Sequence, residues 1–178
     1  MEKIINFLST PFFEEYNKWL GLAGLVLGVS LFIVYNRAVF LNYGWLKSIS
    51  ISWDFVKPHW LFKWFMWGCV LAILCIGQNM IYAIACSFFA IMTWNPTISR
   101  GNVYFIPHMI GAITAITLCV LGTYTLFHNT WVIWTTAVVL IATIYEFRKA
   151  FNLVYWIEIS TLSCLMVGFI VFIFKQFV

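Results

Sequence analysis

The sequence predicts an all-α, polytopic transmembrane helical bundle with about six spans, and three observations support this prediction. First, 63% of the residues are hydrophobic and only 9% are charged, whereas an ordinary soluble domain is about 45–50% apolar and about 25% charged. Second, apolar stretches close to the ~20 residues needed to cross a bilayer recur along the chain. Third, the chain contains ten Trp and eight Tyr, and both side chains favour the interface between lipid and water. Much of the apolar surface is therefore expected to face lipid.

The beginning of the chain predicts an amphipathic segment that lies on the membrane surface. It contains Pro11 and three glutamates, and it lacks the basic region and the following apolar region of a signal peptide. Its large apolar side chains are expected to dip into the interface. Residues 1–18 are thus predicted to form an interfacial segment, and residues 19–178 a single six-span domain.

Six stretches are apolar enough to be predicted as spans. The second and the third are short, and only Gly77, Gln78 and Asn79 separate them. A tight polar turn of this kind fits a helical hairpin. The six predicted spans are Trp19–Phe40, Trp60–Ile76, Met80–Trp94, Tyr104–Phe127, Trp131–Phe147 and Leu153–Phe174.

The basic residues predict the orientation of these spans. An even number of spans puts both termini on one side, where three of the ten Lys and Arg residues lie: Lys3, Lys18 and Lys175. Cytoplasmic loops carry an excess of Lys and Arg, so we expect an inner (cell) membrane protein with both termini outside. The seven basic residues of the predicted cytoplasmic side are Arg37, Lys47, Lys57, Lys63, Arg100, Arg148 and Lys149.

Small residues recur at helical spacing within the spans. Helices in lipid associate through close packing of small residues, because little hydrophobic force acts between them there. Each row indicates a helix–helix contact, and the glycines of the first span could instead form the interface of a homo-oligomer. The clearest rows are Gly21, Gly24 and Gly28 in the first span and Gly111, Ala115, Cys119 and Gly122 in the fourth.

Two titratable residues lie at membrane depth. Glu158 is about six residues into the last span, hence about 8–9 Å along the helix, and His108 is four residues into the fourth span. Both spans enter from the predicted cytoplasmic side, and intramembrane ionisable groups usually face the bundle interior. The pair is therefore a candidate site, although Glu158 could instead form a structural ion pair with Arg37, and His108 could cap its helix after Pro107.

Further polar residues could extend this site. The alternation of Ser48, Ser50 and Ser52 with Ile49, Ile51 and Trp53 predicts an extended segment with one wet side. Ser50 is the nearest candidate nucleophile. Long side chains near span ends can equally reach the headgroups, and loop residues can be solvated. The candidate binding residues are Arg37, Lys63, Glu146, Asp54 and His59.

Short motifs in three parts of the chain resemble a group of small multi-span membrane proteins of Bacteroidetes-like bacteria and their phages. They are Ser48-Ile49-Ser50, His108 at the start of the fourth span, and Trp156-Ile157-Glu158 in the last. The resemblance implies that these positions act together, and it implies no activity. The metal-binding H-x-x-x-H pair of alkaline-ceramidase-like hydrolases is absent.

The sequence leaves three functional interpretations open. The first is a non-enzymatic channel, pore or transporter-like subunit that assembles into oligomers. The second is an intramembrane enzyme that acts on lipid at the cytoplasmic leaflet, with Glu158 as base, His108 as its partner, Arg37 on a phosphate and Ser50 as nucleophile. The third is a membrane interaction factor of a phage or a host-defence system.

Charge and cysteine usage narrow the choice of ligands. The net charge of +4 is scattered along the chain, whereas nucleic-acid binding needs a concentrated basic face. The five cysteines lie in apolar segments without a C-x-x-C pair. We therefore expect the lipid bilayer as the main partner, with no nucleic acid, no metal site and no cofactor.

Overall fold

The computed structural model describes residues 2–49, 51–94 and 105–178 of the chain. Six long helices carry the fold, and their bounds agree with the six predicted stretches to within three residues. They are α2 (Lys18–Tyr43), α4 (Trp60–Gly77), α5 (Met80–Trp94), α6 (Phe105–Phe127), α7 (Trp131–Phe147) and α8 (Leu153–Lys175). Two short helices, α1 (Glu2–Leu8) and α3 (Ser52–Phe55), complete the described part. The predicted all-α bundle is confirmed.

Four of the long helices, α2, α4, α6 and α8, are long and apolar enough to cross a membrane. The apolar helices α5 and α7 are shorter, at 15 and 17 residues. A span needs about 17–25 residues, so α5 falls short of this range and α7 lies at its lower limit. The span count of six therefore depends on these two helices.

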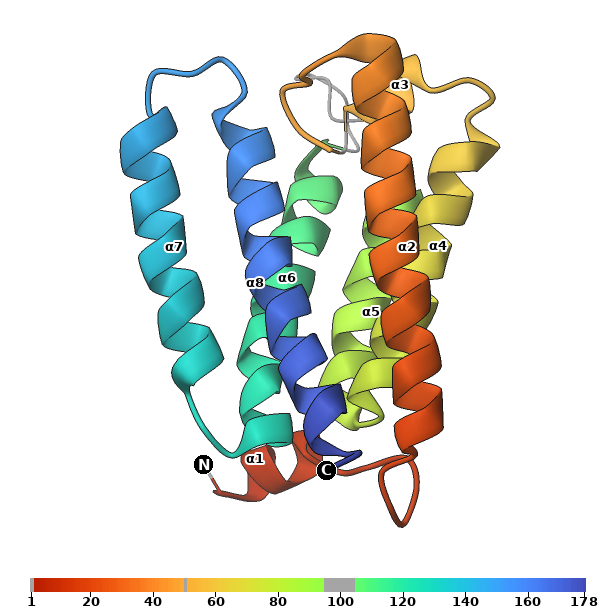
Figure 1. The fold of residues 1–178 in the computed structure, drawn as a ribbon, viewed down its shortest axis with the longest axis vertical. Helices are drawn as coiled ribbons and strands as arrows, with labels where there is room; N and C mark the ends of the chain where they lie inside the picture. The colour runs from red at the N-terminus through yellow and green to blue at the C-terminus, as the bar shows by residue number, and fades with distance from the viewer. Residues whose placement is uncertain (1, 50, 95–104) are drawn as a thin grey trace.

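The long helices run alternately up and down, so that both chain ends lie at the same end of the bundle (Figure 1). We call this the terminal end; it carries α1 and the turn between α4 and α5. The opposite, loop end carries α3 and the loop residues 44–49 and 56–59. The closest helix pairs are α5 with α6, α2 with α4, and α7 with α8. Helix α8 also contacts α2 and α6, whereas α7 stands at the edge of the bundle (Figure 1).

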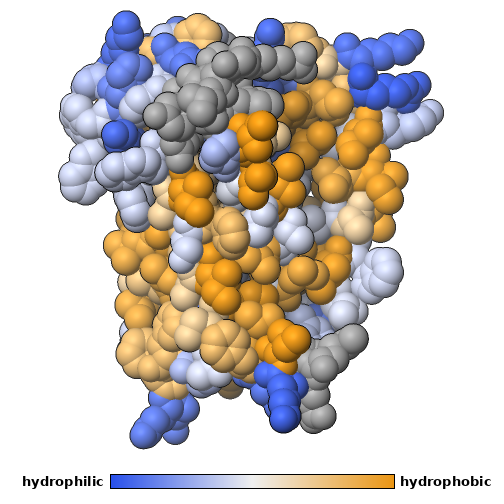
Figure 2. Space-filling model, turned by 180° about the vertical axis from the view of Figure 1, so that it is seen from behind, coloured by the Kyte–Doolittle hydropathy of each residue, from blue (hydrophilic) through white to orange (hydrophobic). Residues whose placement is uncertain are grey.

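Apolar side chains cover the middle of the molecular surface. Figure 2 shows an orange band between two ends where hydrophilic residues gather. Side chains such as Val26, Leu71, Ile113 and Val167 are more than half exposed. In water each square ångström of such surface would cost about 25 cal/mol, whereas in lipid it is solvated. This surface is that of a membrane protein.

The glycine rows lie in contacts between helices of this one chain. A Cβ atom on Gly24 would lie 2.6 Å from Cβ of Cys75 and 2.8 Å from the carbonyl oxygen of Ala72. Across the α5–α6 contact, a Cβ on Gly111 would lie 3.0 Å from the carbonyl oxygen of Phe88. The predicted helix–helix contacts are confirmed at these positions. Gly24 and Gly28 thus face α4, and Gly21 faces Tyr16 and Ile173 of α8, all in the same chain. The homo-oligomer stays a prediction.

The N-terminal segment is bonded to the bundle at the terminal end. Residues Pro11 and Asn79 pair as an antiparallel bridge, in which the amide of Phe12 donates to the carbonyl oxygen of Gln78 at 2.9 Å. The Tyr16 hydroxyl donates to the carbonyl oxygen of Ile76 at 2.9 Å. Burial raises the pKa of that hydroxyl, which keeps it protonated as a donor. Phe12 remains exposed, as expected of the apolar side of an interfacial segment.

Gln78 is the residue through which the first span, the N-terminal segment and the α4–α5 turn meet. Its side-chain oxygen accepts from the amide of Asn17 at 2.9 Å, and its side-chain nitrogen donates to the carbonyl oxygens of Asn17 and Cys75, each at 2.8 Å. Gln78 ends α4 in the left-handed region, with φ of 49°. The sequence marked this turn only as tight and polar. In the structure it fastens the N-terminal segment.

Candidate functional site

A cavity of about 110 Å³ lies between α2, α4, α5, α6 and α8. Its described lining is apolar except for one charged residue, Glu158. The apolar lining comes from all five helices and from one loop residue, Ile49. Cavities of ~150 Å³ with such walls stay free of water and bind small apolar molecules.

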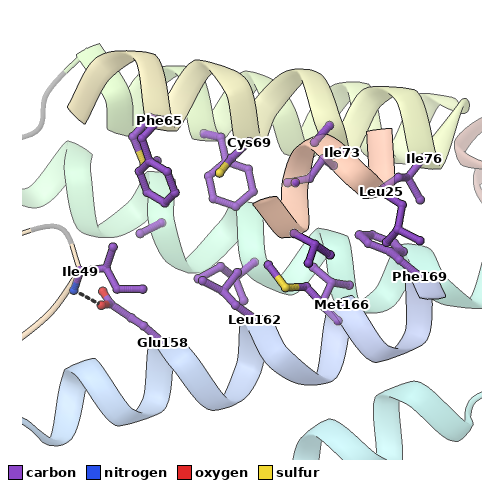
Figure 3. Close-up of a pocket in the computed structure, with 18 of the residues that line it drawn as sticks. Leu25, Ile49, Phe65, Cys69, Ile73, Ile76, Glu158, Leu162, Met166 and Phe169 are labelled. Carbon is purple, nitrogen blue, oxygen red and sulfur yellow. Dashed lines mark hydrogen bonds between the residues drawn. The ribbon is translucent and has the colours of Figure 1, made fainter. Parts of the chain in front are cut away.

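The cavity is elongated along the bundle axis. Figure 3 shows Glu158 and Ile49 at one end and Leu25, Ile76 and Phe169 at the other. The rise of 1.5 Å per residue places Phe169 about 16 Å from Glu158 along α8. Such a shape suits a chain-like molecule with one polar end better than a compact polar solute.

Helix α8 presents Glu158 to the cavity through ordinary helical periodicity. Residues three or four positions apart share one helix face, and Glu158, Leu162, Leu165, Met166 and Phe169 line the cavity at these spacings. Small residues of α8 serve another contact, because a Cβ on Gly168 would lie 3.2 Å from Val132 of α7. The face of Glu158 is therefore one of large apolar side chains.

Residues 44–49 and 51–59 fold inward over the loop end of the cavity. The prediction of an extended segment with wet serines is wrong, because Ser48 and Ser52 are buried and residues Ser52–Phe55 form α3. Serine hydroxyls bond readily to nearby backbone and side chains. Ser48 Oγ accepts from the amide of Ile51 at 3.2 Å, and Ser52 Oγ lies 2.6 Å from the Tyr35 hydroxyl of α2.

This inward fold brings Ile49 against Glu158. The Ile49 side chain belongs to the main apolar core, and its amide donates to Oε2 of Glu158 at 2.5 Å (Figure 3). A hydrogen bond between backbone groups also fixes the segment to α8, since the amide of Tyr155 donates to the carbonyl oxygen of Lys47 at 2.9 Å. The carboxylate therefore joins the loop to the membrane-embedded helix.

The carboxylate retains unused acceptor capacity beside the Ile49 bond. A carboxylate has two oxygens with about four lone-pair sites, and the one bond shown for Glu158 is that of the Ile49 amide to Oε2. Its other oxygen, Oε1, has no hydrogen-bond partner among the described residues. Glu158 is partly accessible rather than fully buried, because it lines the cavity.

His108 and Arg37 do not share this position. His108 is buried, with 1% of its surface exposed, in the first turn of α6, and it is not among the described residues that line the cavity. Arg37 is exposed on α2. In the part of the chain that the structure describes, no ion pair joins it to Glu158, so the structural ion pair considered from the sequence does not form there.

The remaining candidate residues lie outside the cavity. Lys63, Glu146, Asp54 and His59 are all exposed at or near the loop end. The His59 ring stacks on Trp53 with 4.3 Å between centroids, and Lys63 Nζ lies 5.5 Å from a Trp53 ring centroid. This arrangement is typical of side chains at the membrane surface. Ser50, the candidate nucleophile, lies outside the described residues.

One feature of the sequence points to the buried residue of this loop. Ile49 is an apolar residue between serines in the longest loop, and a buried position would explain it.

Comparisons of the chain with protein-family models, with curated proteins and with solved structures find no match.

Proposed function

We propose that this membrane protein binds one lipid-like amphiphile, whose hydrocarbon chain occupies the cavity and whose head group lies at Glu158. The observation that carries the proposal is an elongated apolar cavity with a single charged group at one end. Ligand pockets are in general largely apolar, with a few polar groups that fix the orientation of the ligand. Here the one polar group would fix which end of the ligand faces the loop end.

The cavity favours binding over conduction. Pores for ions are built from rings of backbone carbonyls or of charged side chains, whereas the described lining here is apolar apart from Glu158. Ile49 and the segment around it cover the loop end. A pore between several copies of the chain would need another surface than the glycine row of α2, which packs against α4, α8 and Tyr16 of the same chain.

The geometry also favours binding over turnover. Catalysis by Glu158 with His108, Arg37 and Ser50 would need these groups around one reacting bond, within hydrogen-bond reach of it. Among the described residues, Glu158 lines the cavity while His108 does not, and Arg37 is exposed. A binding protein for an amphiphile is the function that fits this arrangement.

We further propose that the loop end faces the cytoplasm of an inner membrane. The seven basic residues assigned to this side against three on the other support this orientation. Alkaline phosphatase fused after Val178 is expected to be active, because it folds outside the cytoplasm, and a fluorescent protein fused there is expected to be dark. A bright fluorescent fusion with an inactive phosphatase fusion would reverse the orientation.

A cavity-filling substitution tests the binding proposal. Cys69 of α4 points into the cavity (Figure 3), so Cys69→Phe is expected to occupy most of the space. Leu71→Phe, two residues away on the same helix, is the matched control, because Leu71 is 53% exposed on the lipid side. The probe is 1-dodecanol, added to the protein in lipid nanodiscs.

A ligand that binds only the folded state raises the unfolding temperature, by RT ln(1 + [L]/Kd) in free energy. Dodecanol is expected to raise the Tm of the unsubstituted protein and of Leu71→Phe, and to leave that of Cys69→Phe unchanged. If dodecanol shifts the Tm of all three proteins by the same amount, it acts through the bilayer and the proposal fails. The absence of any shift in the unsubstituted protein would also defeat it.

A further inference from the structure

We propose that the head group bound at Glu158 is a cation, an ammonium group at the end of the ligand's hydrocarbon chain. The inference rests on the proposed function and adds the chemical class of the ligand. It starts from the carboxylate of Glu158, which has one hydrogen bond, from the Ile49 amide to Oε2. The second oxygen has no hydrogen bond among the described residues, and it would accept from the ammonium group.

A carboxylate at membrane depth needs a positive or hydrogen-bonding partner. Charged groups within spans usually pair with one another, with backbone groups or with a ligand that acts as counter-ion. Among the described lining residues none is basic, and the basic residues Arg37 and Lys63 are exposed on α2 and α4. An ammonium group on the ligand would supply the missing charge.

The wall opposite Glu158 adds a second feature that suits a cation. Phe65 of α4 lines the same end of the cavity (Figure 3). Its ring stacks on Tyr35, with 4.0 Å between centroids and 6° between planes, which fixes its orientation. A cation within about 6 Å of an aromatic face is attracted by the ring. An ammonium group between Phe65 and Glu158 would meet both attractions, whereas a fatty-acid carboxylate would be repelled by Glu158.

The position of Glu158 along the bundle fits an amphiphile drawn from the bilayer. The residue lies five positions into α8, hence about 8 Å from its start at the loop end. A head group at this depth stays close to the lipid headgroups, while the chain points toward Phe169 and the middle of the bundle. The ligand therefore keeps the orientation of a lipid in that leaflet.

The test compares three probes with one chain length and different heads: dodecylammonium, 1-dodecanol and dodecanoate. Dissociation constants are measured for the full chain in nanodiscs of uncharged lipid. Glu158→Gln is the test variant, because the glutamine oxygen can still accept from the Ile49 amide. Glu146→Gln is the matched control; it removes one negative charge from an exposed position near the same end, outside the cavity.

Dodecylammonium is expected to bind the unsubstituted protein and Glu146→Gln about tenfold or more tightly than dodecanol, as a charge-assisted hydrogen bond predicts. Dodecanoate should bind more weakly than dodecanol. Glu158→Gln should remove the preference for ammonium. It should change the affinity for dodecanol by less than about twofold, because a glutamine oxygen can also accept from an uncharged hydroxyl.

The outcomes separate this inference from the proposed function. Equal binding of all three probes to the unsubstituted protein overturns the inference and leaves the proposed function standing. Binding of none of them overturns both. The comparison among probes on the unsubstituted protein decides the matter even if Glu158→Gln does not fold, since a site as tight for dodecanoate as for dodecylammonium is not a cation site.

Discussion

Gly24→Ala is expected to lower the free energy of unfolding by about 3 kcal/mol, toward the upper end of the range for overpacking. The new methyl group would lie 2.8 Å from the carbonyl oxygen of Ala72 and 2.6 Å from Cβ of Cys75. Both atoms belong to, or are attached directly to, the backbone of α4, so no flexible side chain can move aside. The helices would have to separate along one of the largest contacts of the bundle.

The sign of this prediction opposes intrinsic helix propensity. Alanine in a helix interior is favoured over glycine by about 0.5–1 kcal/mol, so propensity alone would make the variant more stable. The clash is expected to exceed this gain several-fold. Unfolding of the protein in mixed micelles, followed by circular dichroism against increasing denaturing detergent, measures the balance.

Gly28→Ala is the control on the same helix face. Its new methyl group would meet one atom, Cβ of Ala72, at 3.2 Å, a distance that a shift of a few tenths of an ångström relieves. The expected loss is within about 1 kcal/mol, since propensity offsets part of it. Equal losses for the two variants would mean that α2 and α4 separate freely, and the close-packing account would then be wrong.

The helices could be predicted well because lipid constrains them strongly. Every backbone polar group in the hydrocarbon region must be satisfied within the segment, so an apolar stretch of sufficient length is a helix. Polar turns mark the ends clearly, as Gly77 to Asn79 do between α4 and α5. The predicted bounds of α5 and α7 match the observed ones at both ends.

The sequence predicted how far along their helices the candidate site residues lie. It did not predict the direction in which their side chains point around the helix axis. Distance from the end of a span follows from residue count, which set Glu158 apart as a carboxylate within the last apolar helix. The direction in which a side chain points around the helix axis depends on how all the helices pack. His108 illustrates the difference, because its predicted depth is close to that of Glu158 and yet it does not line the cavity.

The segment after α2 was the least predictable part. Its two-residue alternation suggested an extended strand-like stretch. Single hydrogen bonds to distant parts of the chain fold it inward instead. Tyr35 and Ser52 are 17 positions apart, and Ile49 and Glu158 are 109 apart. Sequence periodicity carries no information about pairings at such separations. Among the described loop residues, the apolar Ile49 lines the cavity, whereas Ser48 and Ser52 bond to Ile51 and Tyr35.

Gln78→Ala is expected to lower the free energy of unfolding by about 3 kcal/mol. It removes three side-chain hydrogen bonds, each worth about 0.5–1.5 kcal/mol, and it leaves partners at Asn17 and Cys75 unsatisfied. The N-terminal segment should also detach from the turn, so trypsin is expected to cleave faster after Lys18. Gln176→Ala, at the same end of the bundle, is the control, and its expected change is within ±0.5 kcal/mol.

Gln78→Gly separates the side-chain bonds from the strained backbone. A non-glycine residue in the left-handed region costs roughly 1–2 kcal/mol, and Gln78 has φ of 49°. Glycine removes this cost and the three bonds together. If the bonds dominate, Gln78→Gly is less stable than the unsubstituted protein but more stable than Gln78→Ala, and it shows the same faster cleavage. A glycine variant that is more stable than the unsubstituted protein, with Lys18 still protected, would mean that the backbone bridge and Tyr16 hold the segment without Gln78.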